Sequence, residues 1–333
     1  MDEFILNACS LAGRELGLQR KVEAEDDEIE TTDEQQESTI FRPDTFDEYI
    51  GQENAKKILK QYIKAIKDRG KTFPHVLIHG KAGMGKTTLV RIIANMLDVG
   101  INELITSSIV EFSDLIKEIR ETKEGILFLD EIHALERDLA EKIYTIMEEF
   151  KYKNKYIKPF TLVGATTELG ELLKNRRPFY DRFKIIIELE DYNITDIMGI
   201  TKQYKKMLFE SEDIKSSVYK EIAMNSRGTP RTSLRLLEAS VYYNGNIKEV
   251  LKNCNIIKDG FTSKDLKILK YIASNTAGVG LQGLASYLET SIENYLYLVE
   301  PYLLTSHAIM RTPRGRKITD AGINLIKDLS GCL

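Results

Sequence analysis

Hydrophobic and polar positions divide the chain into a part where strand-like and helix-like patterns alternate and a part with helical spacing alone. Between residues 41 and 192, short apolar runs alternate with segments whose apolar residues recur every three to four positions. This alternation is typical of a parallel sheet covered by helices. The predicted strands are 75–79, 126–130, 159–165 and 184–190, and the predicted helices lie near 52–69, 86–97, 112–121 and 136–150.

The pattern after residue 192 predicts two further domains. Residues 193–260 have helical spacing throughout. The helices predicted there are Ile194–Glu210, Ser216–Asn225, Pro230–Tyr243 and Ile247–Cys254. Residues 261–333 contain three helical patterns followed by an extended basic turn. We therefore predict an α/β domain at 41–192, a small helical domain at 193–260 and a third domain at 261–333.

Residues 1–40 differ from the rest of the chain in charge. Residues 2–18 have the amphipathic spacing of a short helix, and residues 22–38 contain nine carboxylates and no Lys or Arg. Self-repulsion and scarce apolar residues predict that this acidic segment is a disordered linker. Removing nine negative charges from the net charge of −4 leaves +5 on the remainder, which permits contact with nucleic acid. The alternative to a plain solvated linker is an acidic tail that competes for that basic surface.

Composition excludes several classes of protein. The chain has 333 residues, of which 29% are charged, and no apolar run approaches the length of a membrane span. Its N-terminus has no positively charged region of the kind that opens a secretory signal. Cys9, Cys254 and Cys332 are far apart, which argues against a disulfide framework or a zinc site. We expect a cytoplasmic protein without a membrane partner.

The segment Gly80–Thr88 fits the phosphate-binding pattern G-x-x-x-x-G-K-[ST]. It stands between a predicted strand and a predicted helix, where glycines and the helix N-terminus let backbone N–H groups surround a phosphate. We expect Lys86 to reach the β- and γ-phosphates of ATP and the Thr87 hydroxyl to ligate Mg²⁺. The residues of this loop predicted to contact nucleotide are Gly83, Gly85, Lys86, Thr87 and Thr88.

Two other predicted strands end in residues suited to phosphoryl transfer. Asp130 and Glu131 stand at the end of the strand 126–130, where Asp130 suits the Mg²⁺ shell and Glu131 suits activation of the attacking water. Alone, this pair could equally cap the next helix. Thr166 and Thr167 end another strand, and a polar residue there can hold the attacking water. The alternative for them is the ordinary enrichment of Thr in strands.

Three groups of arginines are candidates for contacts with phosphate. Arg182 lies in a turn before the strand 184–190 and could act as an arginine finger on a neighbouring subunit, although Arg176 and Arg177 compete and a surface ion pair is the simpler alternative. Arg231 follows Pro230 at a predicted helix start. The basic turn with Arg311, Arg314 and Arg316 suits the wing of a winged helix that contacts DNA phosphates; a solvated turn is the alternative.

These motifs occur in an order that resembles the RuvB family, the AAA+ ATPases that drive branch migration of Holliday junctions. The resemblance covers about residues 40–325. The segments that carry it are 42–43, 47–52, the phosphate loop, 130–133, 147–150, 159–167, 181–183, 227–231 and 311–316.

The resemblance implies a large AAA+ ATPase domain, a small helical lid and a winged-helix head, assembled as a hexameric ring around duplex DNA. It implies that Phe41 and Arg42 flank the adenine and that Tyr192 and Arg231 contact the nucleotide from the lid side. It also implies that Arg182 is the finger. Glu148, Glu149 and Phe150 are expected to border the nucleotide site, and Arg311 and Arg316 are expected to contact DNA.

Four features depart from the family pattern. Only residues 151–158 stand where the family has a longer hairpin that binds RuvA, which weakens the expectation of a RuvA-like partner. Lys81-Ala82 replaces two prolines, Tyr180 replaces an arginine, and residues 1–40 are additional. We therefore predict an ATP-driven motor acting on branched DNA in recombination and repair. The alternatives are a nucleotide-gated DNA-binding scaffold with little motor activity and a clamp-loader-like protein remodeller.

Overall fold

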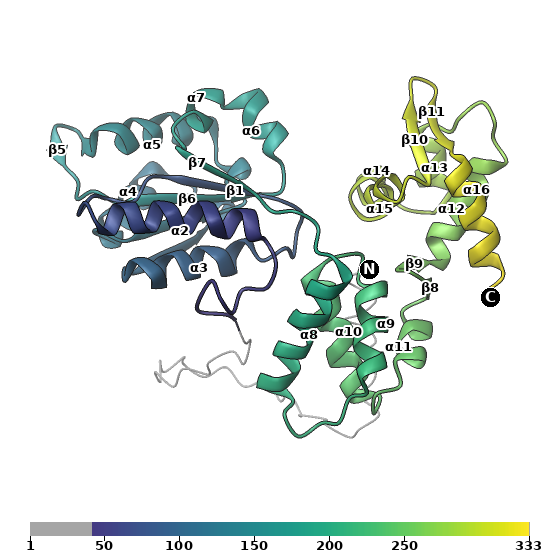
Figure 1. Ribbon diagram of the computed structural model, residues 1–333. Helices are drawn as coiled ribbons and strands as arrows, with labels where there is room; N and C mark the ends of the chain where they lie inside the picture. Colours follow the sequence, from purple (N-terminus) through teal and green to yellow (C-terminus); the bar gives the residue numbers. More distant parts are fainter. Residues whose placement is uncertain (1–41, 333) are drawn as a thin grey trace, which may run out of the picture. The chain divides into compact units, whose positions relative to one another are not determined.

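The computed structural model describes residues 42–332, which divide into two compact units. The first unit ends at Asp196 and the second begins at Ile197 (Figure 1). The predicted N-terminal helix, the acidic segment and Phe41 lie outside the described residues. Within residues 42–332, no helix combines the length and the apolar character needed to cross a bilayer.

The described part of the first unit is built on a five-stranded parallel sheet with the order β2-β3-β6-β1-β7. The strands are β1 (Val76–His79), β2 (Ile101–Ile105), β3 (Ile126–Asp130), β6 (Thr161–Thr166) and β7 (Ile185–Glu188). Helices alternate with these strands, which confirms the predicted α/β class. The edge strand β2 was not predicted, because its side chains are only partly buried and lack an apolar run.

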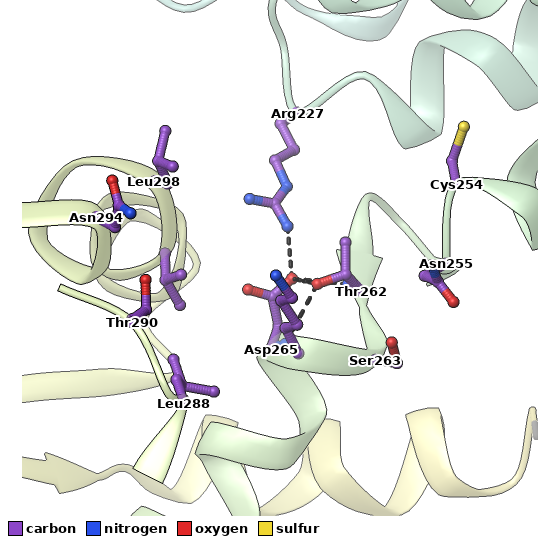
Figure 2. Close-up of a pocket in the computed structure, with 12 residues that line it drawn as sticks. Arg227, Cys254, Asn255, Thr262, Ser263, Asp265, Leu288, Thr290, Asn294 and Leu298 are labelled. Atoms are coloured by element: carbon purple, nitrogen blue, oxygen red, sulfur yellow. Dashed lines mark hydrogen bonds and ion pairs between the residues drawn. The ribbon is translucent and has the colours of Figure 1, made fainter. Parts of the chain in front are cut away.

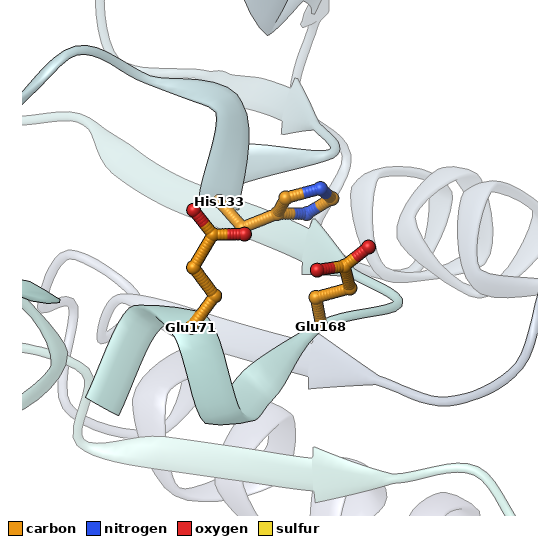
Figure 3. A group of neighbouring side chains, drawn as sticks. All are labelled: His133, Glu168 and Glu171. Carbon is orange, nitrogen blue, oxygen red and sulfur yellow. The ribbon is translucent and has the colours of Figure 1, made fainter. Parts of the chain in front are cut away.

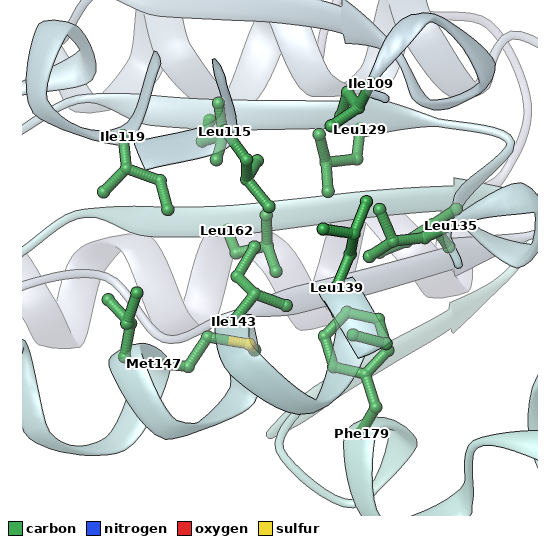
Figure 4. Close-up of a cluster of buried hydrophobic side chains, with 14 of the residues drawn as sticks. Ile109, Leu115, Ile119, Leu129, Leu135, Leu139, Ile143, Met147, Leu162 and Phe179 are labelled. Carbon is green, nitrogen blue, oxygen red and sulfur yellow. The ribbon is translucent and has the colours of Figure 1, made fainter. Parts of the chain in front are cut away.

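Helices cover both faces of this sheet. Leu129 and Leu162 point to one face and pack against α4 (Phe112–Thr122) and α5 (Arg137–Glu149) (Figure 4). On the opposite side from α5 lie the helices α2 (Glu53–Lys67) and α3 (Lys86–Leu97) (Figure 1). They pack on each other, and α3 also contacts β3 and β6. The packing fixes the three central strands, whose carboxyl ends carry the candidate site.

Shorter elements complete the first unit. A hairpin formed by β4 (Lys151–Tyr152) and β5 (Lys155–Tyr156) lies within residues 151–158, the segment that is shorter than in the family pattern. Its turn residues Lys153 and Asn154 both have positive φ, as a two-residue hairpin turn requires. The short helices α6 (Leu169–Asn175) and α7 (Arg177–Tyr180) follow β6 and were not predicted.

Four helices within residues 194–253 form a bundle that we call the lid. They are α8 (Ile194–Leu208), α9 (Ser216–Asn225), α10 (Pro230–Tyr242) and α11 (Ile247–Asn253). Each begins at the predicted residue, because the start signals are local. Pro230 occupies the first turn of α10, and the Asn246 side chain accepts a hydrogen bond from the backbone N–H of Glu249 at the start of α11.

Residues 256–332 form a second bundle that we call the head. Its elements are β8 (Ile256–Lys258), β9 (Phe261–Thr262), α12 (Ser263–Ala273), α13 (Leu281–Tyr287), α14 (Ile292–Asn294), the π-helical turn η3 (Tyr295–Val299), α15 (Glu300–Thr305), β10 (Ile309–Thr312), β11 (Gly315–Ile318) and α16 (Asp320–Ser330). The antiparallel pair β10–β11 is the predicted basic turn, which we call the wing. The short ladder β8–β9 and the last helix α16 were not predicted.

A partly buried histidine, His75, stabilises the start of β1. Its Nδ1 accepts a hydrogen bond from the backbone N–H of Leu162 at 2.8 Å, and its Nε2 lies 3.2 Å from the carbonyl oxygen of Met147. The ring therefore has its proton on Nε2 and is neutral. The rings of Phe150 and Phe160 lie 6.3 and 6.0 Å away between centroids. Burial lowers the pKa of His75 from 6.5 to about 4.

We expect His75 to make the free energy of unfolding depend on pH between about 4 and 6.5. The unfolded chain binds this proton at a higher pH than the folded chain, so stability falls as pH drops through that window, by up to about 3 kcal/mol. Denaturant unfolding of the wild type and of His75→Gln at several pH values checks this. The variant should lack that part of the pH dependence; identical pH profiles would contradict the expectation.

Candidate functional site

The predicted phosphate loop lies between β1 and α3. Gly80, Gly83 and Gly85 have φ values of 155°, 76° and 90°, which favour glycine. A Cβ at Gly85 would also lie only 2.8 Å from the Tyr49 hydroxyl. Lys86 is buried, and its Nζ donates a hydrogen bond to the carbonyl oxygen of Gly80 at 2.9 Å. This shape, at the N-terminus of a 12-residue helix, fits the phosphates of a nucleotide.

Two tyrosines, Tyr49 and Tyr192, contact the backbone of the phosphate loop. The Tyr192 hydroxyl lies 3.2 Å from both the Tyr49 hydroxyl and the carbonyl oxygen of Met84, and its one proton is donated to one of the two at a time. Burial raises the pKa of both tyrosines. Gly51 has a φ of 75°, and a Cβ there would lie 2.8 Å from the Tyr192 ring. The predicted nucleotide residue Tyr192 therefore contacts the loop, and Gly51 is the residue that lets it approach.

Asp130 ends β3 and Glu131 follows it, and the carboxylate of Glu131 is held by the residue after β6. The two strands pair in parallel, so both end at the same edge of the sheet. The Glu131 Oε2 atom accepts hydrogen bonds from the backbone N–H of Thr167 at 3.1 Å and from its hydroxyl at 3.0 Å. The Asp130 Oδ1 atom accepts one from the backbone N–H of Glu131 at 3.0 Å. Ile132 packs where a side chain at Gly164 would stand, since a Cβ there would be 2.6 Å from its Cδ1.

His133 connects Thr166 to the same network. Its Nδ1 lies 2.9 Å from the Thr166 hydroxyl and 3.3 Å from Glu131 Oε2. Glu168 and Glu171 face the same ring (Figure 3), and one ligand atom from each of the three side chains lies within 4.8 Å of the others. Because Nδ1 contacts Thr166 and Glu131, the His133 ring belongs to the hydrogen-bond network at the ends of β3 and β6.

The predicted finger Arg182 is paired within its own unit. Its Nη1 lies 3.0 Å from Glu148 Oε1, its guanidinium lies 5.4 Å from the Tyr144 ring centroid, and its buried Nε has no partner among the described residues. Glu148 and Phe150 lie beside His75, at the amino end of β1. The phosphate loop follows the opposite end of that strand. The structure therefore brings Glu148 to the finger and not to the phosphate loop of the same chain.

Three other predicted nucleotide residues lie in different surroundings. Arg42 has a buried Nη1 with no partner among the described residues, and burial lowers the pKa of its guanidinium. Glu149 is exposed at the end of α5. Arg231 is the exposed second residue of α10 and belongs to the second unit.

The arginines of the wing differ in their surroundings. Glu300, with no exposed surface, accepts two hydrogen bonds from Arg316 at 2.7 and 3.1 Å and two from Arg311 at 3.1 Å. Burial alone would raise the pKa of Glu300, but these hydrogen bonds lower it. The Arg316 side chain is 14% exposed and that of Arg311 is 60% exposed. Arg314, in the turn, is exposed.

The strand order, the phosphate loop and the carboxylate pair after β3 define a P-loop ATPase of the AAA+ class joined to a winged helix. A family model described as "Holliday junction DNA helicase RuvB P-loop domain" matches residues 41–189, and one described as "RuvB C-terminal winged helix domain" matches residues 258–327. The chain belongs to the RuvB family.

Individual relatives agree with this assignment. The Holliday junction branch migration complex subunit RuvB of Phytoplasma mali is 34% identical over 325 residues, covering 90% of this chain and 96% of the relative. The structure of the Thermotoga maritima RuvB Holliday junction branch migration motor superposes with a TM-score of 0.73 at 36% identity, covering 86% and 98% of the two chains. An Aeropyrum pernix ORC2 protein, at 12% identity and a TM-score of 0.51, shares the fold alone.

Sequence reasoning missed four contributors to these sites. Tyr49 and His133 stand inside quoted motifs but received no role, and Arg176, which donates to the carbonyl oxygen of His133 at 2.6 Å, was considered only as a finger. Glu300 was not considered. Its pairing with two arginines depends on the fold of the head, so no local signal could have revealed it.

We expect Thr167→Val to lower the rate of ATP hydrolysis roughly 10- to 100-fold, because Glu131 loses one of two hydrogen bonds that orient its carboxylate. Nucleotide affinity should stay unchanged. Steady-state turnover and equilibrium binding of labelled ATP measure both quantities. Thr145→Val, an exposed position on α5, is the matched control. Wild-type turnover in Thr167→Val would refute the role given to Thr167.

Proposed function

We propose that this chain is an ATP-driven motor that moves branched duplex DNA, such as Holliday junctions, as a hexameric ring in the cytoplasm. The observation that carries the proposal is the pair of hydrogen bonds from Thr167 to the Glu131 carboxylate, at the sheet edge where the phosphate loop also lies. In this arrangement the Glu131 carboxylate has a fixed orientation and can activate a water molecule beside a phosphate-binding site. The names of the relatives, which refer to branch migration of Holliday junctions, support the choice of substrate.

In the proposed mechanism, the loop residues Gly83, Gly85, Lys86 and Thr88 hold the phosphates of ATP. Thr87 and Asp130 offer the oxygen ligands that Mg²⁺ prefers, and the ion would neutralise charge on the phosphates. Glu131 orients and polarises the attacking water, while Thr167 keeps its carboxylate directed.

The remaining contacts of the nucleotide would come from the edges of the site. Phe41, Arg42 and Tyr192 are proposed to hold the adenine side, and Arg231 is proposed to contact the nucleotide from the lid. Arg182 would leave Glu148 and reach the ATP of a neighbouring protomer, where a guanidinium stabilises charge on the transferred phosphoryl group. Because Glu148, Glu149 and Phe150 share the end of α5 with that ion pair, their proposed nucleotide contact would also be with the neighbour.

A DNA-binding scaffold with little motor activity is the second candidate. The hairpin β4–β5, with strands of two residues each, favours it, because a small hairpin offers little surface for a partner that loads the ring on a junction. Measuring ATP turnover and junction movement with the purified full-length protein separates the two functions. Turnover with movement supports the motor; DNA binding that needs ATP but proceeds without turnover supports the scaffold.

Mixing two inactive variants tests whether the finger acts between protomers. Lys86→Ala should abolish nucleotide binding, and Arg182→Ala should bind ATP but hydrolyse it about 10³-fold more slowly. A mixture of the two should recover part of the turnover, because Lys86→Ala protomers still present Arg182 to intact phosphate loops. Replacing Lys86→Ala by the Lys86→Ala/Arg182→Ala double variant is the control and should restore nothing. Absence of recovery in the first mixture would argue against a finger in trans.

The wing arginines should separate into a DNA contact and a structural residue. Arg314→Ala is expected to weaken DNA binding and reduce the slope of log affinity against log salt by about 1 without changing stability. Arg316→Ala should instead destabilise the head by about 3–5 kcal/mol, because Glu300 stays buried with half its partners. Thermal unfolding and DNA titrations at several salt concentrations measure both. An unchanged salt slope in Arg314→Ala would exclude its phosphate contact.

A further inference from the structure

The lid and the head, which both belong to the second unit, are joined by an arginine that no catalytic role requires. Arg227 lies in the turn between α9 and α10 and has a φ of 55°. Its Nε donates a hydrogen bond to the carbonyl oxygen of Gly260 at 2.8 Å, and its Nη2 lies 2.5 Å from Asp265 Oδ2 (Figure 2). The side chains of Arg227 and Asp265 are only 11% and 2% exposed.

Further contacts hold the turn at Asp259 and Gly260, which connects β8 to β9 in the head. The Arg227 guanidinium lies 4.2 Å from the centroid of the Tyr302 ring, and the Tyr302 hydroxyl donates to the carbonyl oxygen of Asp259. The Asn225 Oδ1 atom accepts a hydrogen bond from the backbone N–H of Gly260 at 3.0 Å. A Cβ at Gly260 would lie 2.8 Å from Arg227 Cγ, so only glycine allows this approach. Two lid residues, Asn225 and Arg227, therefore hold the backbone N–H and the carbonyl oxygen of Gly260 in the head.

The ion pair does more than complete the local structure of the head. Asp265 already caps α12, because its Oδ2 accepts hydrogen bonds from the backbone N–H and the hydroxyl of Thr262, both at 2.7 Å. Arg227 adds a third donor to the same oxygen from a different domain. Desolvation offsets much of the attraction in a buried ion pair, so what such a pair contributes most directly is a fixed geometry.

The contact between Arg227 and Asp265 lies between Arg231, the candidate nucleotide contact of the lid, and the wing. Arg231 follows Arg227 by four residues, and the Thr229 hydroxyl, at the N-terminus of α10, donates to the carbonyl oxygen of Arg227 at 3.4 Å. On the other side, α12 carries Asp265 and packs against β11, the wing strand that contains Arg316. Packed elements of this kind can carry a displacement from one site to another.

We propose that Arg227 is a positioning residue that makes the lid and the head move as one body, so that a displacement of Arg231 by nucleotide reaches the wing. The inference rests on the proposed function, because it concerns how ATP and DNA sites communicate. It adds a residue of the R-G-T-P-R segment whose partners lie in the head and not at the nucleotide.

The test uses full-length Arg227→Gln and measures DNA affinity with and without a non-hydrolysable ATP analogue. The ratio of the two affinities should fall roughly 5- to 10-fold toward 1, within the usual range of coupling between sites. Affinities for ATP analogue alone and for DNA alone should stay within about twofold of wild type, since neither site is altered. Arg137→Gln, which removes an exposed ion pair on α5, is the matched control.

Two milder variants keep the test meaningful if Arg227→Gln folds poorly. Arg227→Lys keeps the charge but cannot bridge Gly260 and Asp265 as a planar fork, so its ratio should be intermediate. Tyr302→Phe keeps the ring beneath the guanidinium and should leave most of the coupling. A purely structural role would lower the melting temperature and both separate affinities in parallel while the ratio stays at its wild-type value, and that result would overturn the proposal.

A second measurement separates failure of this inference from failure of the motor function. Junction movement per ATP hydrolysed should fall roughly tenfold in Arg227→Gln while turnover is nearly unchanged. If the wild type hydrolyses ATP but moves no junction, the motor function is wrong, and the affinity ratio still decides the role of Arg227. If the wild type moves junctions and Arg227→Gln keeps both the ratio and the yield of movement, only the inference is wrong.

Discussion

The parallel pairing of β3 with β6 is the constraint on which the candidate catalytic site depends. It places the ends of the two strands together, so that both hydrogen-bond donors of Thr167 reach one carboxylate oxygen of Glu131. Gly164 lets Ile132 pack on β6 and fixes the segment that carries Glu131. Because β1 pairs with the other side of β6, the phosphate loop follows at the same edge. A shift in this register would separate Glu131 from the phosphate loop and leave two motifs without a common site.

Buried carboxylates organise the second unit in a similar way. Glu300 holds the two strands of the wing by pairing with Arg311 and Arg316, and Asp265 holds the head to the lid by pairing with Arg227. In both places a carboxylate with little or no exposure accepts several hydrogen bonds from arginine, which fixes geometry more surely than it adds stability. The basic wing motif therefore combines structural residues and exposed ones. Membership in the RuvB family does not distinguish them, whereas the exposure of each guanidinium does.

The ion pair between Arg182 and Glu148 within one chain would have to break if Arg182 served a neighbouring subunit. The pairing of Arg182 with Glu148 occupies the guanidinium in the single chain, and the buried Nε of Arg182 has no partner among residues 42–332. A finger that serves a neighbour would exchange this carboxylate for phosphate oxygens, so nucleotide binding and subunit contact would be linked by one side chain. The small hairpin β4–β5 is on the same unit and follows α5 directly, so the proposed contact with a neighbour and the hairpin both lie at the end of that helix.

The sequence by itself determined the phosphate loop, the carboxylate pair after β3, the α/β class and the starts of the four lid helices. Each of these depends on residues close together in the chain, such as glycines at positive φ, a proline in a first turn or an uninterrupted apolar run. It did not reveal the edge strand β2, whose half-exposed residues give no apolar run, or the helix α16. Only the tertiary structure decided that Thr167 holds Glu131, that Glu300 holds Arg316 and that Arg227 joins lid to head. Those partners are distant in sequence, and a hydrogen bond between them exists only once strand register and helix packing have brought the two groups within about 3 Å.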